Sequence, residues 1–368
     1  KLPSGFKPLA VISIADNIRE DAIQTIRWFK ENDVDIKIIS GDNPVTVSEV
    51  AKRVGVVNAD KYVSLEGFNE KEVEAIANKY TVFGRVTPEQ KAVLVKAIKS
   101  AGHTVAMTGD GVNDILALKE ADCAVTVMSG SDAAKNVSHI VLTDNNFASM
   151  PKVVFEGRRV INNIQNSSSL YLMKTLFVTV FALLSIIMMR QYPFVTSNMM
   201  VLEFFVIGFP TFFLSLQPNK NRVKGKFLSF VLSRAVPGAI VLILAVQSIN
   251  VVTYFHPELF KDYYTEISVY LISFAGLTML YRVCQPFNFP RALLFIAMLA
   301  ISLLCLTLMP NIFIDENYWA EGYPHVGFVQ IMYVLLVVML CIPISGILLR
   351  LTDRLMRGSE QKEKNPVK

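Results

Sequence analysis

The chain has 368 residues, enough for two domains, and 52% of them are hydrophobic whereas only 18% are charged. A mean hydropathy of +0.41 excludes an ordinary soluble protein, in which about 25% of residues are charged. The net charge of +5 invites a nucleic-acid partner. However, the basic residues of the second half fall mainly in alternate loops between apolar runs, which favours a lipid bilayer and no nucleic acid.

The first part of the chain, to about residue 166, mixes charged and apolar residues as globular domains do. In chain order it predicts a strand at 9–14, a helix at 16–32, a strand at 34–39, a helix at 45–54, a strand ending at 83–85, a helix at 88–101, a strand at 104–107 and a helix at 115–121. Strands that alternate with helices indicate an α/β, Rossmann-like fold with a parallel, doubly wound sheet.

Polar motifs follow the predicted strands directly, where ligands of such sheets bind. Asp110 and Asp114 are four residues apart across a glycine-containing turn, so both carboxylates can face one Mg2+. Ser40 follows another strand and can hold phosphate oxygens together with nearby amides. Lys91, at the start of its helix, can neutralise charge on a phosphoryl group. Each feature alone is weak, but the ordered set predicts phosphoryl transfer.

The second part of the chain contains six apolar windows long enough to cross a bilayer, which takes about 20 residues. We predict spans at 169–189, 197–217, 230–253, 267–284, 291–309 and 327–350. Basic residues gather after the second, fourth and sixth spans, whereas Glu258, Asp262, Glu266 and a second acidic group fall in the other loops. Since basic loops stay inside, both ends of the membrane domain are predicted to be cytoplasmic. The four cysteines, Cys123, Cys284, Cys305 and Cys341, are scattered and predict buried thiols.

Three stretches resemble the haloacid-dehalogenase superfamily and, within it, the P-type ATPases. They are Ser40 to Asn43 (Ser-Gly-Asp-Asn), Gly84 to Lys91 (Gly-Arg-Val-Thr-Pro-Glu-Gln-Lys) and Met107 to Asp122, which opens with Met-Thr-Gly-Asp-Gly-Val-Asn-Asp. Gly157-Arg158-Arg159 with Asn162-Asn163 resembles the family's stalk into a membrane helix. The resemblance implies a phosphorylation domain at 1–150, a stalk at 151–168, six membrane helices at 169–350 and a cytoplasmic tail at 351–368.

The resemblance also implies Mg2+ and ATP as cofactors. Asp110 would bind Mg2+, Asn113 and Asp114 would position the phosphate and order the site, and Lys91 would contact the phosphoryl group. The other implied residues would contact phosphate or nucleotide: Ser40, Gly41, Asp42 and Arg85. The family's phosphorylated aspartate lies in Asp-Lys-Thr-Gly-Thr, a string that these 368 residues do not contain. We therefore expect a fragment that acts with a missing N-terminal part and is inactive alone.

Ionisable residues inside membrane spans are candidates for the transport site. Lys174 lies in the first predicted span and Glu203, the only carboxylate within the predicted spans, in the second. Pro210 removes a backbone hydrogen bond and so frees carbonyl oxygens that can bind an ion. The alternatives are a Lys174 that snorkels to the cytosol, a Glu203 that is solvated, or a Lys174 that acts as a built-in counter-cation. Ile207 replaces the aspartate that calcium pumps carry before Gly-Leu-Pro, so the chain resembles a bacterial cation-pump branch.

The expected function is part of a plasma-membrane P-type ATPase that couples ATP hydrolysis, through an aspartyl-phosphate, to transport of a cation, with Ca2+ the first candidate. Lipid or polyamine transport by the same mechanism is an alternative. A membrane-anchored phosphatase of the same superfamily and a non-catalytic membrane fragment also remain open, although six spans exceed what an anchor needs.

Overall fold

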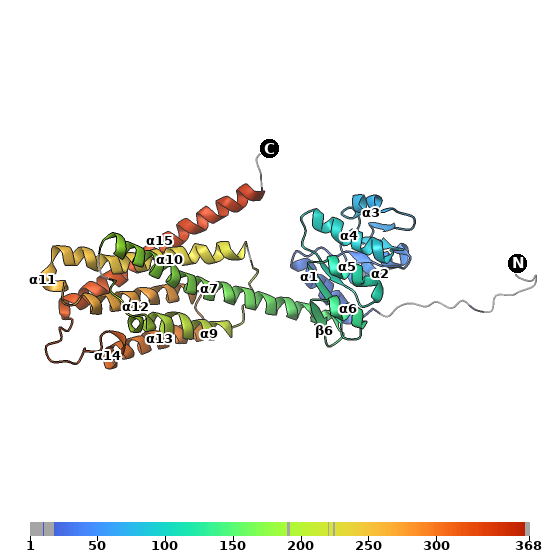
Figure 1. Ribbon diagram of the computed structural model, residues 1–368. Helices are drawn as coiled ribbons and strands as arrows, with labels where there is room; N and C mark the ends of the chain where they lie inside the picture. Colours follow the sequence, from blue (N-terminus) through green and yellow to red (C-terminus); the bar gives the residue numbers. More distant parts are fainter. Residues whose placement is uncertain (1–9, 11–17, 190–191, 220, 224, 365–368) are drawn as a thin grey trace, which may run out of the picture. The chain divides into compact units, whose positions relative to one another are not determined.

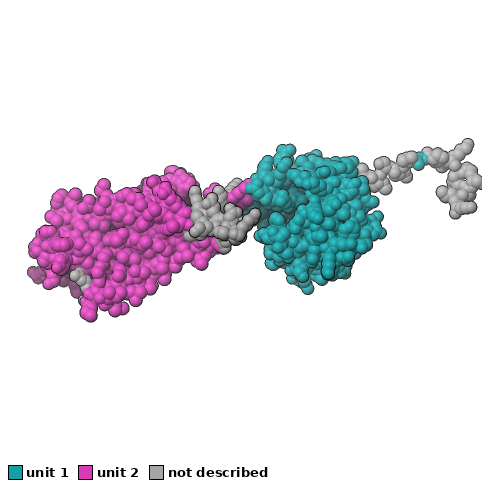
Figure 2. All heavy atoms as spheres, turned by 90° about the horizontal axis from the view of Figure 1, so that it is seen from above, with its two compact units in different colours: residues 1–154 teal, residues 155–368 magenta. Residues whose placement is uncertain are grey.

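The computed structural model describes residues 10, 18–189, 192–219, 221–223 and 225–364. The chain divides into two compact units, residues 1–154 and 155–368 (Figure 2). The predicted strand at 9–14 lies almost wholly outside the described residues.

The first unit alternates short strands with helices, as predicted (Figure 1). Its helices are α1 (Glu20–Glu31), α2 (Pro44–Val54), α3 (Glu70–Ile76), α4 (Pro88–Ser100), α5 (Ile115–Glu120) and α6 (Asp132–Val137), with single turns η1 (Val112–Asp114) and η2 (Phe147–Ser149). Its strands are β1 (Ile38–Ile39), β2 (Tyr62–Ser64), β3 (Val82–Gly84), β4 (Ala106–Thr108), β5 (Cys123–Val127) and β6 (Ile140–Leu142).

The described strands of this unit form two three-stranded parallel sheets, which agrees with the predicted parallel α/β fold. The described strands pair in the orders β1-β3-β2 and β4-β5-β6. Ile39 pairs with Phe83 in the first sheet, and Met107 pairs with Ala124 in the second. Among the described residues, no strand pairs one sheet with the other.

Each sheet buries its own apolar cluster beneath the helices that follow its strands. Phe83 of β3 and Leu94 of α4 are fully buried in the first cluster, and Met107 of β4 packs with Leu118 of α5 in the next. Helix α4 starts with a capping box, in which Thr87 and Gln90 satisfy each other's backbone N–H groups. Proline follows at the first helical position, where its missing N–H costs nothing. The start of α4 is thus fixed by sequence.

The second unit is all helical, and α7 (Met150–Ile187) begins just before its boundary. The other elements are α8 (Thr196–Val201), η3 (Leu202–Gly208), α9 (Phe209–Ser215), α10 (Phe227–Phe255), α11 (Pro257–Phe260), α12 (Tyr264–Val283), α13 (Phe289–Leu308), α14 (Pro310–Phe313) and α15 (Phe328–Lys364) (Figure 1). Among the described residues, six helices are long and apolar enough to cross a membrane. This confirms the predicted number of spans.

Helix α12 is the most enclosed of these helices: 72% of its most apolar window is buried, against 17% for the last span. It packs against α10, α15 and η3. The cysteine prediction holds only in part, because Cys284 and Cys341 are buried whereas Cys123 and Cys305 are partly exposed. Cys123 opens strand β5, and Cys305 lies on α13, a helix with only 22% of its window buried.

Candidate functional site

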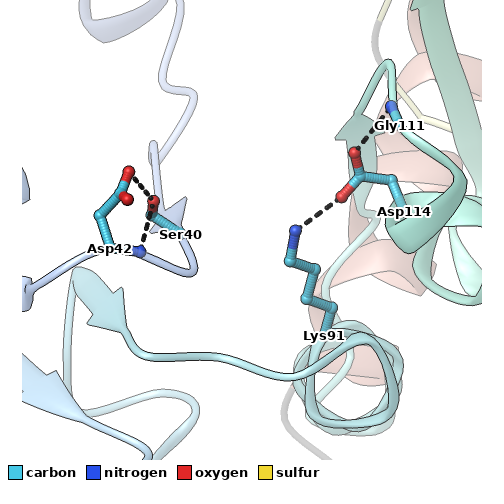
Figure 3. A network of polar contacts seen from close by, with 5 residues as sticks. All are labelled: Ser40, Asp42, Lys91, Gly111 and Asp114. Carbon is cyan, nitrogen blue, oxygen red and sulfur yellow. Dashed lines mark hydrogen bonds and ion pairs between the residues drawn. The ribbon is translucent and has the colours of Figure 1, made fainter.

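An ion pair beyond the end of β4 forms the centre of the candidate phosphoryl-transfer site (Figure 3). The Nζ atom of Lys91 lies 2.7 Å from Oδ1 of Asp114, and the two side chains are only 14% and 12% exposed. The backbone N–H of Gly111 donates to the other carboxylate oxygen, Oδ2, over 3.2 Å. Both oxygens of Asp114 are therefore engaged, and the ammonium of Lys91 is held at the loop.

Several contacts outside the pair fix β4 and α4 relative to one another. The N–H of Val105 donates to Asp122 over 2.8 Å, and Lys99 of α4 lies 3.2 Å from the same carboxylate. The hydrogen bond from Val105, assisted by the Lys99 ammonium, holds the pKa of Asp122 below its usual value. Lys91 lies in the first turn of α4, and Asp114 ends η1 directly before α5. The start of α4 and the turn before α5 thus bring together Lys91 and Asp114, which are 23 positions apart in the sequence.

Asp110 and Asn113 occupy the exposed part of the same loop. The backbone carbonyl of Asp110 accepts a hydrogen bond from the N–H of Ser131 over 2.9 Å, which holds the turn. An exposed carboxylate fits the oxygen ligands that Mg2+ prefers, with water and phosphate completing its shell. Because Asp114 is paired with Lys91, Asp110 is the better placed of the two carboxylates to bind a metal ion directly.

Ser40 and Asp42 form a second polar group, after β1 (Figure 3). The Oγ of Ser40 donates to Asp42 over 3.0 Å and accepts from the N–H of Asp42 over 3.1 Å. Arg85 closes this loop, since its N–H donates to the carbonyl of Asp42 over 2.9 Å while its φ is +53°. A left-handed conformation is uncommon for a residue other than glycine, and such strain concentrates at functional sites. Among the described residues, no hydrogen bond connects this loop to Lys91 or Asp114.

Gly109 is required by the close approach of its backbone to Asp114. A Cβ at this position would lie 2.5 Å from the Cβ of Asp114. We expect Gly109→Ala to lower the free energy of unfolding by about 1–3 kcal/mol, as overpacking does. Gly41→Ala is the matched control, because a Cβ there meets nothing within 4 Å. Thermal unfolding measures both variants, and equal stabilities would contradict the steric argument.

A second candidate site lies within the membrane helices. Lys174 of α7 forms an ion pair with Glu203, at the start of η3. The η3 segment is a π-helical turn, in which the N–H of Phe209 donates to the carbonyl of Phe204, five residues back. The buried Pro210, directly after, has no N–H to donate. Turns of this kind are frequent at functional sites. The structure thus brings together Lys174 and Glu203, which the sequence singled out separately, and Pro210 lies just beyond the end of η3.

One residue that sequence reasoning placed in a loop lies inside a membrane helix. Glu266 belongs to α12, which begins at Tyr264, and only 1% of the residue is exposed. The statement that Glu203 is the only carboxylate within the spans was therefore wrong. One feature of the sequence could have indicated that Glu266 lies in the helix, namely Tyr270 one helical turn further on. The O–H of Tyr270 donates to the carboxylate of Glu266.

Comparisons with known proteins agree with both units. A family model described as haloacid dehalogenase-like hydrolase matches residues 3–122. The chain is 36% identical over 307 residues to the "Probable cation-transporting ATPase exp7" of Streptococcus pneumoniae serotype 4, covering 80% of this chain and 39% of that protein. It is 42% identical over 250 residues to the "Calcium-transporting ATPase CtpE" of Mycobacterium bovis, covering 65% and 31%.

A third relative is the "Probable cation-transporting P-type ATPase" of Mycoplasma genitalium, 30% identical over 237 residues and covering 61% of this chain and 27% of that protein. The chain thus spans less than half the length of these relatives.

The parallel strands with polar loops at their ends, and the family match, define the first unit as a haloacid dehalogenase-like hydrolase domain. In this chain that domain is continuous with helices that can cross a membrane. The chain belongs to the P-type ATPases of the haloacid-dehalogenase superfamily. It is part of a multi-pass membrane protein.

Proposed function

We propose that the complete protein hydrolyses ATP through an aspartyl-phosphate and uses the energy to move a cation across the membrane. The observation that carries this proposal is the Lys174–Glu203 ion pair beside a π-helical turn, in a chain that also holds the Lys91–Asp114 loop. Neither an anchor nor a membrane scaffold needs a charged pair between its spanning helices, because such groups are costly there. The phosphorylated aspartate is proposed to lie in a part of the protein beyond these 368 residues.

In the hydrolase domain, Asp110 is proposed to hold Mg2+, with Asn113 beside it and Asp114 ordering the loop through Gly111. When bound there, Mg2+ would supply positive charge against the charge that develops during phosphoryl transfer. Lys91 supplies a second positive charge at the phosphoryl group, fixed in place by Asp114. The loop of Ser40, Gly41, Asp42 and Arg85 is proposed to bind phosphate or the nucleotide.

In the membrane domain, Glu203 is proposed to bind the transported cation, helped by carbonyl oxygens that the turn before Pro210 leaves free. Without the cation, Lys174 takes its place as a built-in counter-charge. The pair is partly exposed on the second unit, with side chains 27% and 47% accessible. Because a charged pair facing lipid is costly, we propose that further membrane helices of the complete protein cover this face.

The proposed cation is Ca2+, since two of the three relatives named above are called cation-transporting and the other calcium-transporting. The proposed location is the plasma membrane. The hydrolase domain and the C-terminus are proposed to lie in the cytoplasm, which the basic residues after the second, fourth and sixth spans support.

The test is ATP hydrolysis by the complete protein in lipid vesicles, scanned across Ca2+, Mg2+, Mn2+, K+, polyamines and phospholipids. We expect Ca2+ to stimulate hydrolysis and to enter the vesicles, and Asp110→Asn to abolish both. Stimulation by a polyamine or a phospholipid alone would replace the cation with that substrate. Vanadate-sensitive hydrolysis that no compound stimulates would contradict transport while keeping the phosphoryl chemistry.

A further inference from the structure

Glu266 is a buried carboxyl group whose two oxygens differ in their hydrogen bonding. The O–H of Tyr270 donates to Oε1 over 3.1 Å, and the O–H of Tyr318 donates to the same atom over 3.0 Å. Oε2 is buried and, among the described residues, has no hydrogen-bond partner of normal geometry, although the backbone of Val326 also interacts with the carboxyl group. Tyr270 lies on α12 itself, whereas Tyr318 comes from the loop 315–327, which covers this end of the helix.

Aromatic side chains of the loop surround the carboxyl group. The ring of Tyr318 lies 4.8 Å from that of His325 and 5.0 Å from that of Tyr323. Burial raises the pKa of Tyr318 and of Tyr323 to about 12, so both stay neutral at physiological pH. His325, in contrast, is exposed.

The other elements packed here bring no positive charge to Glu266. Ile249 of α10 and Val334 of α15 join the apolar cluster around Ile267, the residue after Glu266. Tyr333 of α15 is hydrogen-bonded to Ser248 instead. Among the described residues, the titratable groups that face Glu266 are Tyr270, Tyr318, Tyr323 and His325, with Asp315 beside Tyr323.

These surroundings favour the protonated acid over the carboxylate. A buried carboxylate that lacks a cationic partner gives up its charge by binding a proton. The start of α12 favours the anion through its helix dipole, but that effect is small beside the cost of burying an ion. In the acid form Oε1 is the carbonyl oxygen that accepts from both tyrosines, and Oε2 carries the proton.

We propose that Glu266 is a proton-binding site of the membrane unit, which holds a proton at neutral pH and exchanges it with water on the side of the 315–327 loop, the loop whose Tyr318 donates to its carboxyl group. In uptake, Oε2 of the carboxylate accepts a proton from water or hydronium on that side, and the hydroxide or water left behind returns to the solvent. The site is formed by side chains separate from the Lys174–Glu203 pair, so it stands whether or not that pair binds a cation.

Infrared difference spectroscopy of the complete protein in lipid, titrated from acidic to alkaline pH, tests this proposal. We expect a C=O band of a protonated carboxylic acid at neutral pH that disappears at alkaline pH. Glu266→Gln should remove the band. Glu258→Gln, which changes an exposed glutamate outside the site, should leave it unchanged.

If Glu266→Gln fails to fold, Tyr318→Phe should still shift the frequency of the band by removing one hydrogen bond. Absence of a Glu266 band at every pH would overturn the proposal. A band that stays constant from acidic to alkaline pH would also overturn it, since the carboxyl would then not exchange its proton.

Discussion

Lys91→Met in the complete protein is expected to slow formation of the phosphoenzyme by about 100-fold or more, the effect of removing one group that stabilises transition-state charge. The ammonium of Lys91 is fixed 2.7 Å from Asp114 and largely shielded from water, which strengthens its field at the loop. The variant also leaves Asp114 with only the N–H of Gly111 as partner. Incorporation of radioactive phosphate from ATP, followed in the first turnover, measures the effect.

Lys96→Met is the matched control, because Lys96 is an exposed lysine of the same helix α4. It should leave phosphoenzyme formation within a factor of about two, as surface substitutions usually do. Lys91→Arg keeps the charge and should recover part of the rate, although a planar guanidinium cannot reproduce a point charge. If Lys91→Met phosphorylates as fast as Lys96→Met, the ammonium is a structural partner of Asp114 and takes no part in the chemistry.

The loops of the hydrolase domain were predictable because strand ends carry ligands in parallel α/β folds. Lys91 and Asp114 were both predicted from their positions after a strand or at a helix start. Their mutual ion pair was not, because it depends on how α4 packs against the turn η1. Spacing alone allowed either Asp110 or Asp114 as the metal ligand and only the family resemblance chose Asp110, a choice that the pairing of Asp114 with Lys91 supports.

In the membrane half, hydropathy alone did not predict where each helix begins. The apolar window begins after Glu266, so the sequence placed this residue in a loop, whereas the helix starts at Tyr264. Its burial depends on Tyr318, which is 52 positions further along the chain. The π-helical turn at η3 was also missed. Pro210 predicted a broken hydrogen bond, but the extra residue in the turn follows from packing around Glu203 and cannot be deduced from a proline alone.

Glu203→Gln and Lys174→Met should have opposite effects on the apparent affinity for the transported cation. Truncating one partner of a desolvated charge pair costs about 2–5 kcal/mol, so Glu203→Gln should weaken cation stimulation by about 30-fold or more. Lys174→Met removes the competitor for the same carboxylate. If the pair is worth about 1.5 kcal/mol, a value at the low end for close charges, the cation should bind about tenfold more tightly.

The concentration of cation that gives half-maximal ATP hydrolysis measures both changes, with Glu321→Gln, an exposed glutamate of the 315–327 loop, as control. In the double variant Glu203→Gln/Lys174→Met, the gain from losing Lys174 should vanish, because no carboxylate remains to compete for. Independent, additive effects of the two substitutions would show that Lys174 does not act through Glu203. If the side chain of Lys174 instead extends to the cytosol, Lys174→Met should leave the half-maximal cation concentration unchanged. The ion pair between α7 and η3 would then only hold these two segments together.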